Sequence, residues 1–90
     1  MLDLQQLQSF CMVAQMHNFT RAAAKLGFSQ SSVTLHVKGL ERELGASLLT
    51  RSRFSKTVEL TEVGRRALVY AERLLALAAE AKTAVNALRS

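Results

Sequence analysis

The stretch FTRAAAKLGFSQSSVTLHVKGLE, residues 19–41, carries the strongest fold signal in this chain of 90 residues. Two helical patterns, over about residues 20–26 and 30–44, flank Gly27, which can adopt the positive φ of a tight turn. Ala23 supplies the small residue that a helix-turn-helix needs where its helices cross. The alternative is an ordinary amphipathic helical hairpin with a solvated face. Because several independent requirements coincide, we favour the helix-turn-helix.

The second of these helices presents a polar face, whereas Val33 and Val37 are spaced to hold it against the first. Its uncharged hydrogen-bonding side chains suit a helix that enters the major groove of DNA. Ser29 is in addition the expected N-cap. The candidates for the outward side and the N-terminal end of this helix are Ser29, Gln30, Ser31, Ser32, Thr34, Leu35, His36 and Lys38.

The regions on either side predict three further elements. Apolar residues at three- and four-residue intervals indicate a helix over residues 3–16, which His17 and Asn18 end. Two short β-prone runs, residues 48–50 and 57–60, predict a hairpin. A long helix is expected to follow an N-cap at Thr61.

Together these elements predict a mainly α fold. It is a winged helix-turn-helix of three helices and a short β-hairpin wing, followed by a long linker and dimerisation helix. We assign residues 1–61 to the winged helix-turn-helix domain and residues 62–90 to the long helix.

Positive charge is concentrated in the middle of the chain. Twelve Lys and Arg against seven Asp and Glu give a net charge of +5, and residues 20–57 alone carry seven bases and two acids. Arg51, Arg53 and Lys56 lie around the expected wing tip. A short charge run is usually a solvated loop, but directly after a helix-turn-helix it favours contact with DNA phosphates or the minor groove.

The long last helix repeats apolar residues in alternating three- and four-residue steps, the a/d seam of a coiled coil. The seam consists of Ala67, Tyr70, Leu74, Leu77, Ala81, Ala84 and Leu88. Packing against the first helix explains the turns around Leu68 but hardly the rest of so long a helix. The pattern therefore predicts self-association through this helix.

Composition and residue types argue against several protein classes. The length allows one small domain, the 49% hydrophobic content argues against disorder, and the lack of proline disfavours an all-β fold. Cys11 is the only cysteine, so no internal disulfide can form, which suits a reducing cytoplasm. The pattern shows no signal peptide and no membrane span. Metal-ligand spacings, phosphate loops and paired carboxylates are absent from the sequence, so we expect no enzyme, metal or cofactor.

Two runs carry a family resemblance: LDLQQLQSFCMVAQMHNFTRAAAKLGFSQSSVTLHVKGLERELGASLLTRS and, after it, ELTEVGRRAL. Over about residues 2–88 they resemble the N-terminal DNA-binding domain of LysR-type transcriptional regulators. The resemblance implies a bacterial, cytoplasmic protein, nucleoid-associated when bound, that binds an interrupted inverted repeat in promoter DNA. It further implies a homodimer through paired linker helices, a tetramer at full length, and a small-molecule effector sensed by a C-terminal domain that this chain lacks.

The resemblance also assigns roles by position. Those implied along the major groove are Gln30, Ser31, Thr34, Leu35, His36 and Lys38. Those implied at phosphates or the minor groove are Thr20, Ser29, Arg51 and Arg53. The sequence departs from the family pattern in three ways. Ser31 stands where proline is common, Leu35 stands where arginine is common, and the segment between Arg51 and Thr61 is a residue or two longer than usual. A winged-helix module that binds protein instead of DNA is the alternative, although such a docking surface would more often expose aromatic residues.

Overall fold

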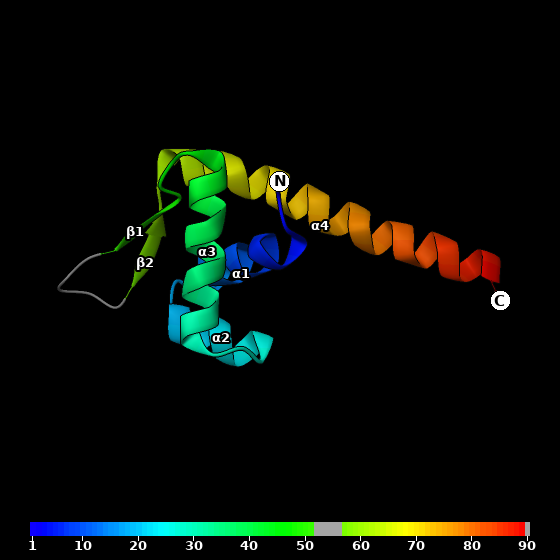
Figure 1. Cartoon of the computed structure of the whole chain (residues 1–90), viewed down its shortest axis with the longest axis horizontal. Helices are drawn as coiled ribbons and strands as arrows, with labels where there is room; N and C mark the ends of the chain where they lie inside the picture. Colours follow the sequence, from blue (N-terminus) through cyan, green and yellow to red (C-terminus); the bar gives the residue numbers. More distant parts are fainter. Residues whose placement is uncertain (52–56, 90) are drawn as a thin grey trace.

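The computed structural model describes residues 1–51 and 57–89. In chain order its elements are α1 (Leu4–Met16), α2 (Phe19–Leu26), α3 (Gln30–Leu44), β1 (Leu49–Arg51), β2 (Val58–Leu60) and α4 (Glu62–Arg89). This order confirms the predicted mainly α fold with a two-stranded hairpin and a long last helix. Figure 1 shows α4 running away from the unit formed by α1, α2 and α3, so the molecule is elongated, at 52 × 26 × 19 Å.

Side-chain caps begin the first three helices. The side chains of Asp3, Asn18 and Ser29 each accept a backbone N–H from the first turn of the helix that follows. Gly27 and Gly45 end α2 and α3 with φ values of 76° and 70°. The left-handed turn expected at Gly27 is therefore present, and it sets the angle at which α3 leaves α2.

The junction between α1 and α2 differs from the sequence expectation. His17 adopts the left-handed conformation, at φ 57°, and its carbonyl oxygen accepts the N–H of Val58 in β2 at 2.9 Å. Asn18 instead caps α2 by accepting the N–H of Arg21 at 2.8 Å. Because Asn18 is the cap, α2 begins at Phe19, one residue earlier than predicted.

The core lies where α1 meets α2, α3 and the strands. Its fully buried apolar side chains are Phe10, Val13, Ala22, Val33, Val37, Leu40 and Leu48. Ala23 at the helix crossing is 4% exposed. The predicted contact between the two helices of the motif is therefore confirmed, and α1 is the platform on which both rest.

The two strands pair in antiparallel fashion, with Leu49 opposite Leu60 and Arg51 opposite Val58. Each strand begins one residue later than the pattern predicted. The amino-terminal end of the long helix lies beside the wing, because the N–H of Thr61 donates to the carbonyl oxygen of Leu48 at 3.0 Å. The hairpin is thereby attached to both the core and α4.

Helix α4 packs against α1 along its first half. Thr61 is its N-cap, as expected, with its Oγ1 accepting the N–H of Gly64 at 2.9 Å. Ala71 is buried, and Leu68 and Leu75 pack against the core. Contact with the rest of the chain therefore extends further than the turn around Leu68 that we expected.

Glycine is required where α4 passes the wing. A Cβ placed on Gly64 would lie well under 3.0 Å from the backbone carbonyl oxygen of Leu48, and backbone cannot move aside cheaply. This close approach fixes the direction in which α4 leaves the domain.

Candidate nucleic-acid interface

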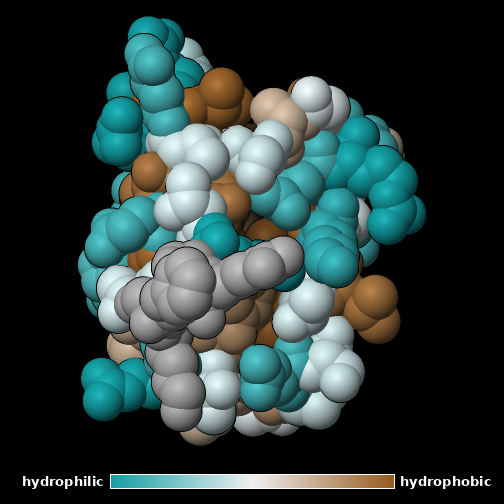
Figure 2. All heavy atoms as spheres, turned by 90° about the vertical axis from the view of Figure 1, so that its left-hand side faces the viewer, coloured by the Kyte–Doolittle hydropathy of each residue, from teal (hydrophilic) through white to brown (hydrophobic). Residues whose placement is uncertain are grey.

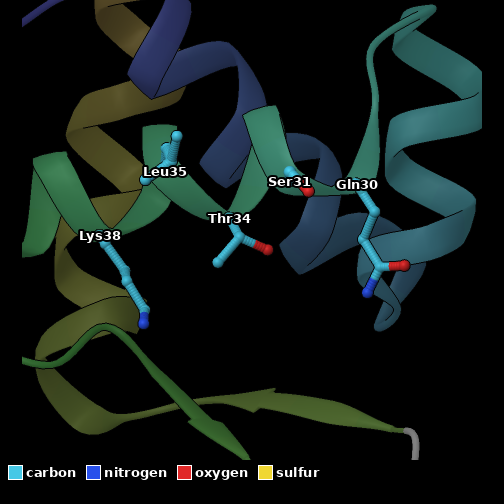
Figure 3. A pocket seen from close by; sticks show the side chains of 5 residues that line it. All are labelled: Gln30, Ser31, Thr34, Leu35 and Lys38. Atoms are coloured by element: carbon cyan, nitrogen blue, oxygen red, sulfur yellow. The ribbon is translucent and has the colours of Figure 1, made fainter.

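The outer face of α3 forms a shallow hollow of about 390 Å³. It is lined by Gln30, Ser31, Thr34, Leu35 and Lys38. Figure 3 shows Gln30, Thr34 and Lys38 pointing toward the side of the view that holds the strands, whereas Leu35 points the opposite way. Because residues four apart share a helix face, the first three form one polar row and Ser31 and Leu35 form a second row beside it.

The polar surface continues from α3 onto the start of α2. Thr20 Oγ1 donates to Gln30 Oε1 at 3.2 Å. Asn18, Phe19, Thr20 and Gln30 line a second hollow of about 260 Å³. The predicted phosphate-contacting Thr20 and the predicted base-contacting Gln30 are therefore adjacent and connected.

Ser29 and Ser32 organise the N-terminus of α3. Ser29 Oγ accepts the N–H of Ser32 at 3.1 Å and donates to Ser32 Oγ at 2.9 Å. The hydroxyls of both residues are thus engaged with each other. These hydrogen bonds fix the first turn of α3. The positive end of the helix dipole lies there and favours negatively charged groups.

His36, which we expected on the outward side of α3, is half-buried at the edge of that face. Its Nδ1 lies 2.7 Å from Oγ of Ser9, a fully buried residue of α1. Its ring also meets the edge of Phe28, with centroids 5.4 Å apart at 80°. The reason is helical geometry, because His36 follows Val33 by three residues and precedes Leu40 by four, which places it at the edge of the buried stripe.

The base of the wing lies beside α2. The Arg51 guanidinium stands over the ring of Phe19, 4.6 Å from its centroid. In the part of the chain that the structure describes, no carboxylate pairs with Arg51 or with Lys38, Arg21 or Lys25. Arg53 and Lys56, the other predicted wing contacts, lie outside the described residues.

Figure 2, which looks at the wing end of the molecule, shows mostly hydrophilic and intermediate side chains there, with hydrophobic ones in small separate groups. This face therefore carries unpaired positive charge and hydrogen-bonding groups, as a surface for an anionic polymer requires.

Sequence reasoning missed two residues that position this surface. Ser9 anchors His36 as described, and its place in α1 gave no signal. Glu41 of α3 accepts the N–H of Leu48 at 2.8 Å through Oε2, which fixes the chain between α3 and β1. An acid in the second half of a helix opposes the helix dipole, and that unfavourable position is the signal that could have indicated a specific partner.

The seam of α4 divides into two parts. Ala67, Tyr70 and Leu74 line an apolar hollow of about 230 Å³ together with Leu2, Leu7, Leu44 and Ala71. The later seam residues, Leu77, Ala81, Ala84 and Leu88, are exposed. Leu77 is 61% and Leu88 88% exposed, so nothing in the described chain covers this end.

The thiol of Cys11 is the next group to consider as a reactive site. Burial, followed by the charge of Glu72, raises the pKa of the Cys11 thiol to about 11, so the thiol is protonated and unreactive near neutral pH. Within residues 1–51 and 57–89, no cluster of three or more His, Cys, Asp or Glu side chains could hold a metal ion. In the same residues, no helix combines the length and the apolar character needed to cross a membrane.

Comparison with known proteins agrees with this geometry. The family model for bacterial regulatory helix-turn-helix proteins of the lysR family matches residues 4–65. The uncharacterized HTH-type transcriptional regulator YwqM of Bacillus subtilis is 42% identical over 88 residues, which are 98% of this chain and 29% of that protein. BudR of Raoultella terrigena, another HTH-type transcriptional regulator, is 45% identical over 76 residues, 84% of this chain and 26% of that one. The chain thus spans less than a third of these relatives.

The structure of this chain is also similar to those of domains solved in complex with DNA. The DNA-binding domain of CbnR bound to DNA has a TM-score of 0.88 and 35% identity, covering 98% of this chain and 99% of that one. The DNA-binding domain of BenM bound to benA site 1 DNA has a TM-score of 0.88 and 32% identity, covering 98% and 97%. With the family model matched from α1 into the first turn of α4, the chain belongs to the lysR family of bacterial regulatory helix-turn-helix proteins and carries its DNA-binding domain.

Proposed function

We propose that this domain binds double-stranded DNA sequence-specifically, with α3 in the major groove and the wing against the backbone and minor groove. The observation that carries the proposal is the α3 hollow, where hydrogen-bonding side chains line the surface. Nearby cations such as Lys38 and Arg51 have no acidic partner among the residues that the structure describes. An α-helix fits the major groove, where each base pair presents a distinct pattern of donors and acceptors. The similar domains of CbnR and BenM were solved in complex with DNA, which supports DNA as the partner.

The contacts divide by chemistry. Gln30 can pair with adenine through two hydrogen bonds, and Lys38 with guanine or a phosphate. Ser31 and Thr34 are the proposed further hydrogen-bonding groups along the groove, and Thr20 and Ser29 are the proposed phosphate contacts. Ser32 acts through the cap of α3. We leave His36 out of the contact set because its ring is engaged with Ser9.

Arg51, Arg53 and Lys56 are the proposed wing contacts. Arg51 is supported by its place beside the start of α2, where it stacks over Phe19. The roles of Arg53 and Lys56 rest on their charge and on their position between the two strands. Such contacts set affinity and register more than sequence preference.

A dimer through α4 is part of the proposal. The exposed seam from Leu77 to Leu88 supports it, because exposed apolar residues at coiled-coil spacing are covered by a second helix. A two-fold dimer presents two copies of α3 to the duplex, so the target would be an inverted repeat with an interruption between half-sites.

The proposal is tested by selecting bound sequences from a randomised duplex pool. The selection is carried out at about 0.15 M salt, which screens non-specific electrostatic binding. We expect two inverted half-sites at fixed spacing. Binding without enrichment would contradict sequence-specific readout. Absence of binding would favour the protein-interaction module instead.

The wing assignment has its own test. Arg51→Ala should weaken binding to all duplexes and reduce the slope of log affinity against log salt by about one, because one phosphate contact is lost. Arg89→Ala, the same change of charge at the far end of α4, is the matched control and should leave the slope unchanged. An unchanged slope in Arg51→Ala would contradict the wing contact.

The remaining roles follow the longer relatives. We propose that the protein is a regulator without catalytic activity, acting at promoters in the bacterial cytoplasm. In a protein of the relatives' length, the part beyond this domain would sense a small-molecule effector and assemble a tetramer.

A further inference from the structure

One apolar side chain lies among the polar groups of the α3 hollow. Leu35 is 67% exposed, and it lines the hollow together with Gln30, Ser31, Thr34 and Lys38. Figure 3 shows its side chain pointing away from the strands, whereas Gln30, Thr34 and Lys38 in the neighbouring row point toward them. A single exposed leucine on a protein surface is ordinary. Here, however, it occupies the face that the proposed function places against base edges.

The orientation of Leu35 is fixed by its neighbours in α3. Val33 and Val37, two residues to either side, are fully buried against α1 and α2. His36, the next residue, is bonded to the buried Ser9. Because these three side chains prevent rotation of α3 about its axis, Leu35 cannot turn inward to find an apolar environment. With α3 in the major groove, as proposed above, Leu35 faces the floor or wall of the groove.

The chemistry of the major groove leaves one apolar partner. Guanine, adenine and cytosine present hydrogen-bond donors and acceptors there, and only thymine adds a methyl group. Leu35 against any other base would desolvate polar atoms without replacing their hydrogen bonds, which is unfavourable. Resting on the proposed function, we propose that Leu35 is a specificity-determining residue that recognises the 5-methyl group of a thymine in each half-site.

Removing single methyl groups from the DNA tests this inference. Each thymine of the selected half-site is replaced in turn by uracil, which lacks only the methyl group, and affinity is measured at about 0.15 M salt. For the unchanged protein we expect one position where uracil binds about fourfold more weakly, as loss of one buried methyl predicts. At that position 5-methylcytosine should bind more tightly than cytosine.

Variants of the protein connect the effect to Leu35. Leu35→Ala should bind the thymine and uracil duplexes within about 1.5-fold of each other at that position, while other positions keep their preferences. Leu4→Ala removes the same atoms from a half-exposed residue of α1 outside the hollow, and it should retain the fourfold difference. Leu35→Arg should shift the preferred base toward guanine, the usual partner of arginine.

The outcomes separate the inference from the function on which it rests. A selected half-site in which no thymine responds to uracil would overturn the role of Leu35 and leave specific DNA binding intact. The same would follow if Leu35→Ala kept the full difference between thymine and uracil. A pool without any enriched sequence would overturn both the proposed function and this inference.

Discussion

The three-helix unit (α1, α2 and α3) and the outer half of α4 both carry apolar residues at helical spacing. These residues are buried in the three-helix unit, whereas in outer α4 they are exposed to solvent. In the three-helix unit the repeating positions Phe10, Val33 and Val37 are 0% exposed. In outer α4 the repeating Leu77 and Leu88 are 61% and 88% exposed. The spacing of residues thus determines which face of a helix is apolar, but only a neighbouring element determines whether that face is buried. The first region provides folding stability, and the second is available for association.

The sharpest test of this contrast uses one substitution in both regions. Leu40→Ala in α3 should lower the free energy of unfolding by about 2–5 kcal/mol, because it leaves a cavity in a closed core. Leu77→Ala, at an exposed site, should change it by less than about 0.5 kcal/mol in dilute protein, where chains are monomeric. Urea unfolding followed by circular dichroism measures both. Similar losses in the two variants would show that outer α4 is part of the folding core.

The point where the two regions join is the next most sensitive. Replacing an exposed helical glycine by alanine ordinarily stabilises a helix by about 1 kcal/mol. Gly64→Ala should instead cost about 1–3 kcal/mol, because the new Cβ collides with the backbone carbonyl of Leu48. In the control Gly39→Ala, the Cβ meets only the end of the Gln6 side chain, which can move, so we expect a smaller loss. Thermal unfolding of both variants measures the two losses, and equal losses would contradict the steric role of Gly64.

Association through outer α4 should be separable from folding. Leu77→Glu together with Leu88→Glu should weaken self-association at least about tenfold, because charge would be buried in the seam. The monomer should unfold at the same urea concentration as the unchanged monomer, since both sites are exposed. Leu74 is unsuitable for this test because it also lines the apolar hollow beside Leu7. Dimers that persist in sedimentation experiments would place the interface elsewhere.

Features that depend on neighbouring residues in the sequence can be predicted from it, whereas features that depend on a distant element cannot. The turn at Gly27 and the burial of Val33 and Val37 depend on local chemistry and helical spacing, and both were predicted correctly. The contacts of His36 were not predicted, because it lies at the boundary between the two faces of α3. Its direction depends on Ser9, which is distant in the sequence and brought close by the fold.

The supports of the site were harder to predict than the site surface. Glu41 holds the backbone of Leu48 across a turn, and no periodicity marks a contact between a carboxylate and a backbone N–H. Similarly, the extent to which α4 packs on α1, as far as Leu75, depends on the direction set at Gly64. The groups of the α3 face could be predicted, because exposure of a polar helix face needs no knowledge of distant partners.

A further expected effect concerns Cys11, which lies on the side of α1 near α4. Its thiol has a pKa of about 11 in the folded chain, against 9.0 ordinarily, chiefly because of burial and then because of Glu72. At pH 8 the native thiol should therefore react with a disulfide reagent about a hundredfold more slowly than the urea-unfolded thiol. The folded state keeps the proton over the interval in which the unfolded state loses it. Stability should accordingly fall as pH rises from about 9 to about 11.

Cys11→Ser should remove the part of the pH dependence that this group contributes, because serine does not titrate in that interval. Cys11 is the only cysteine, so the reaction reports on one site without correction. Equal rates for native and unfolded chains would mean that α4 does not cover this side of α1 in solution. That result would place more of α4 outside the folding core than its contacts with α1 indicate, and it would shift the boundary between the two regions toward Gly64.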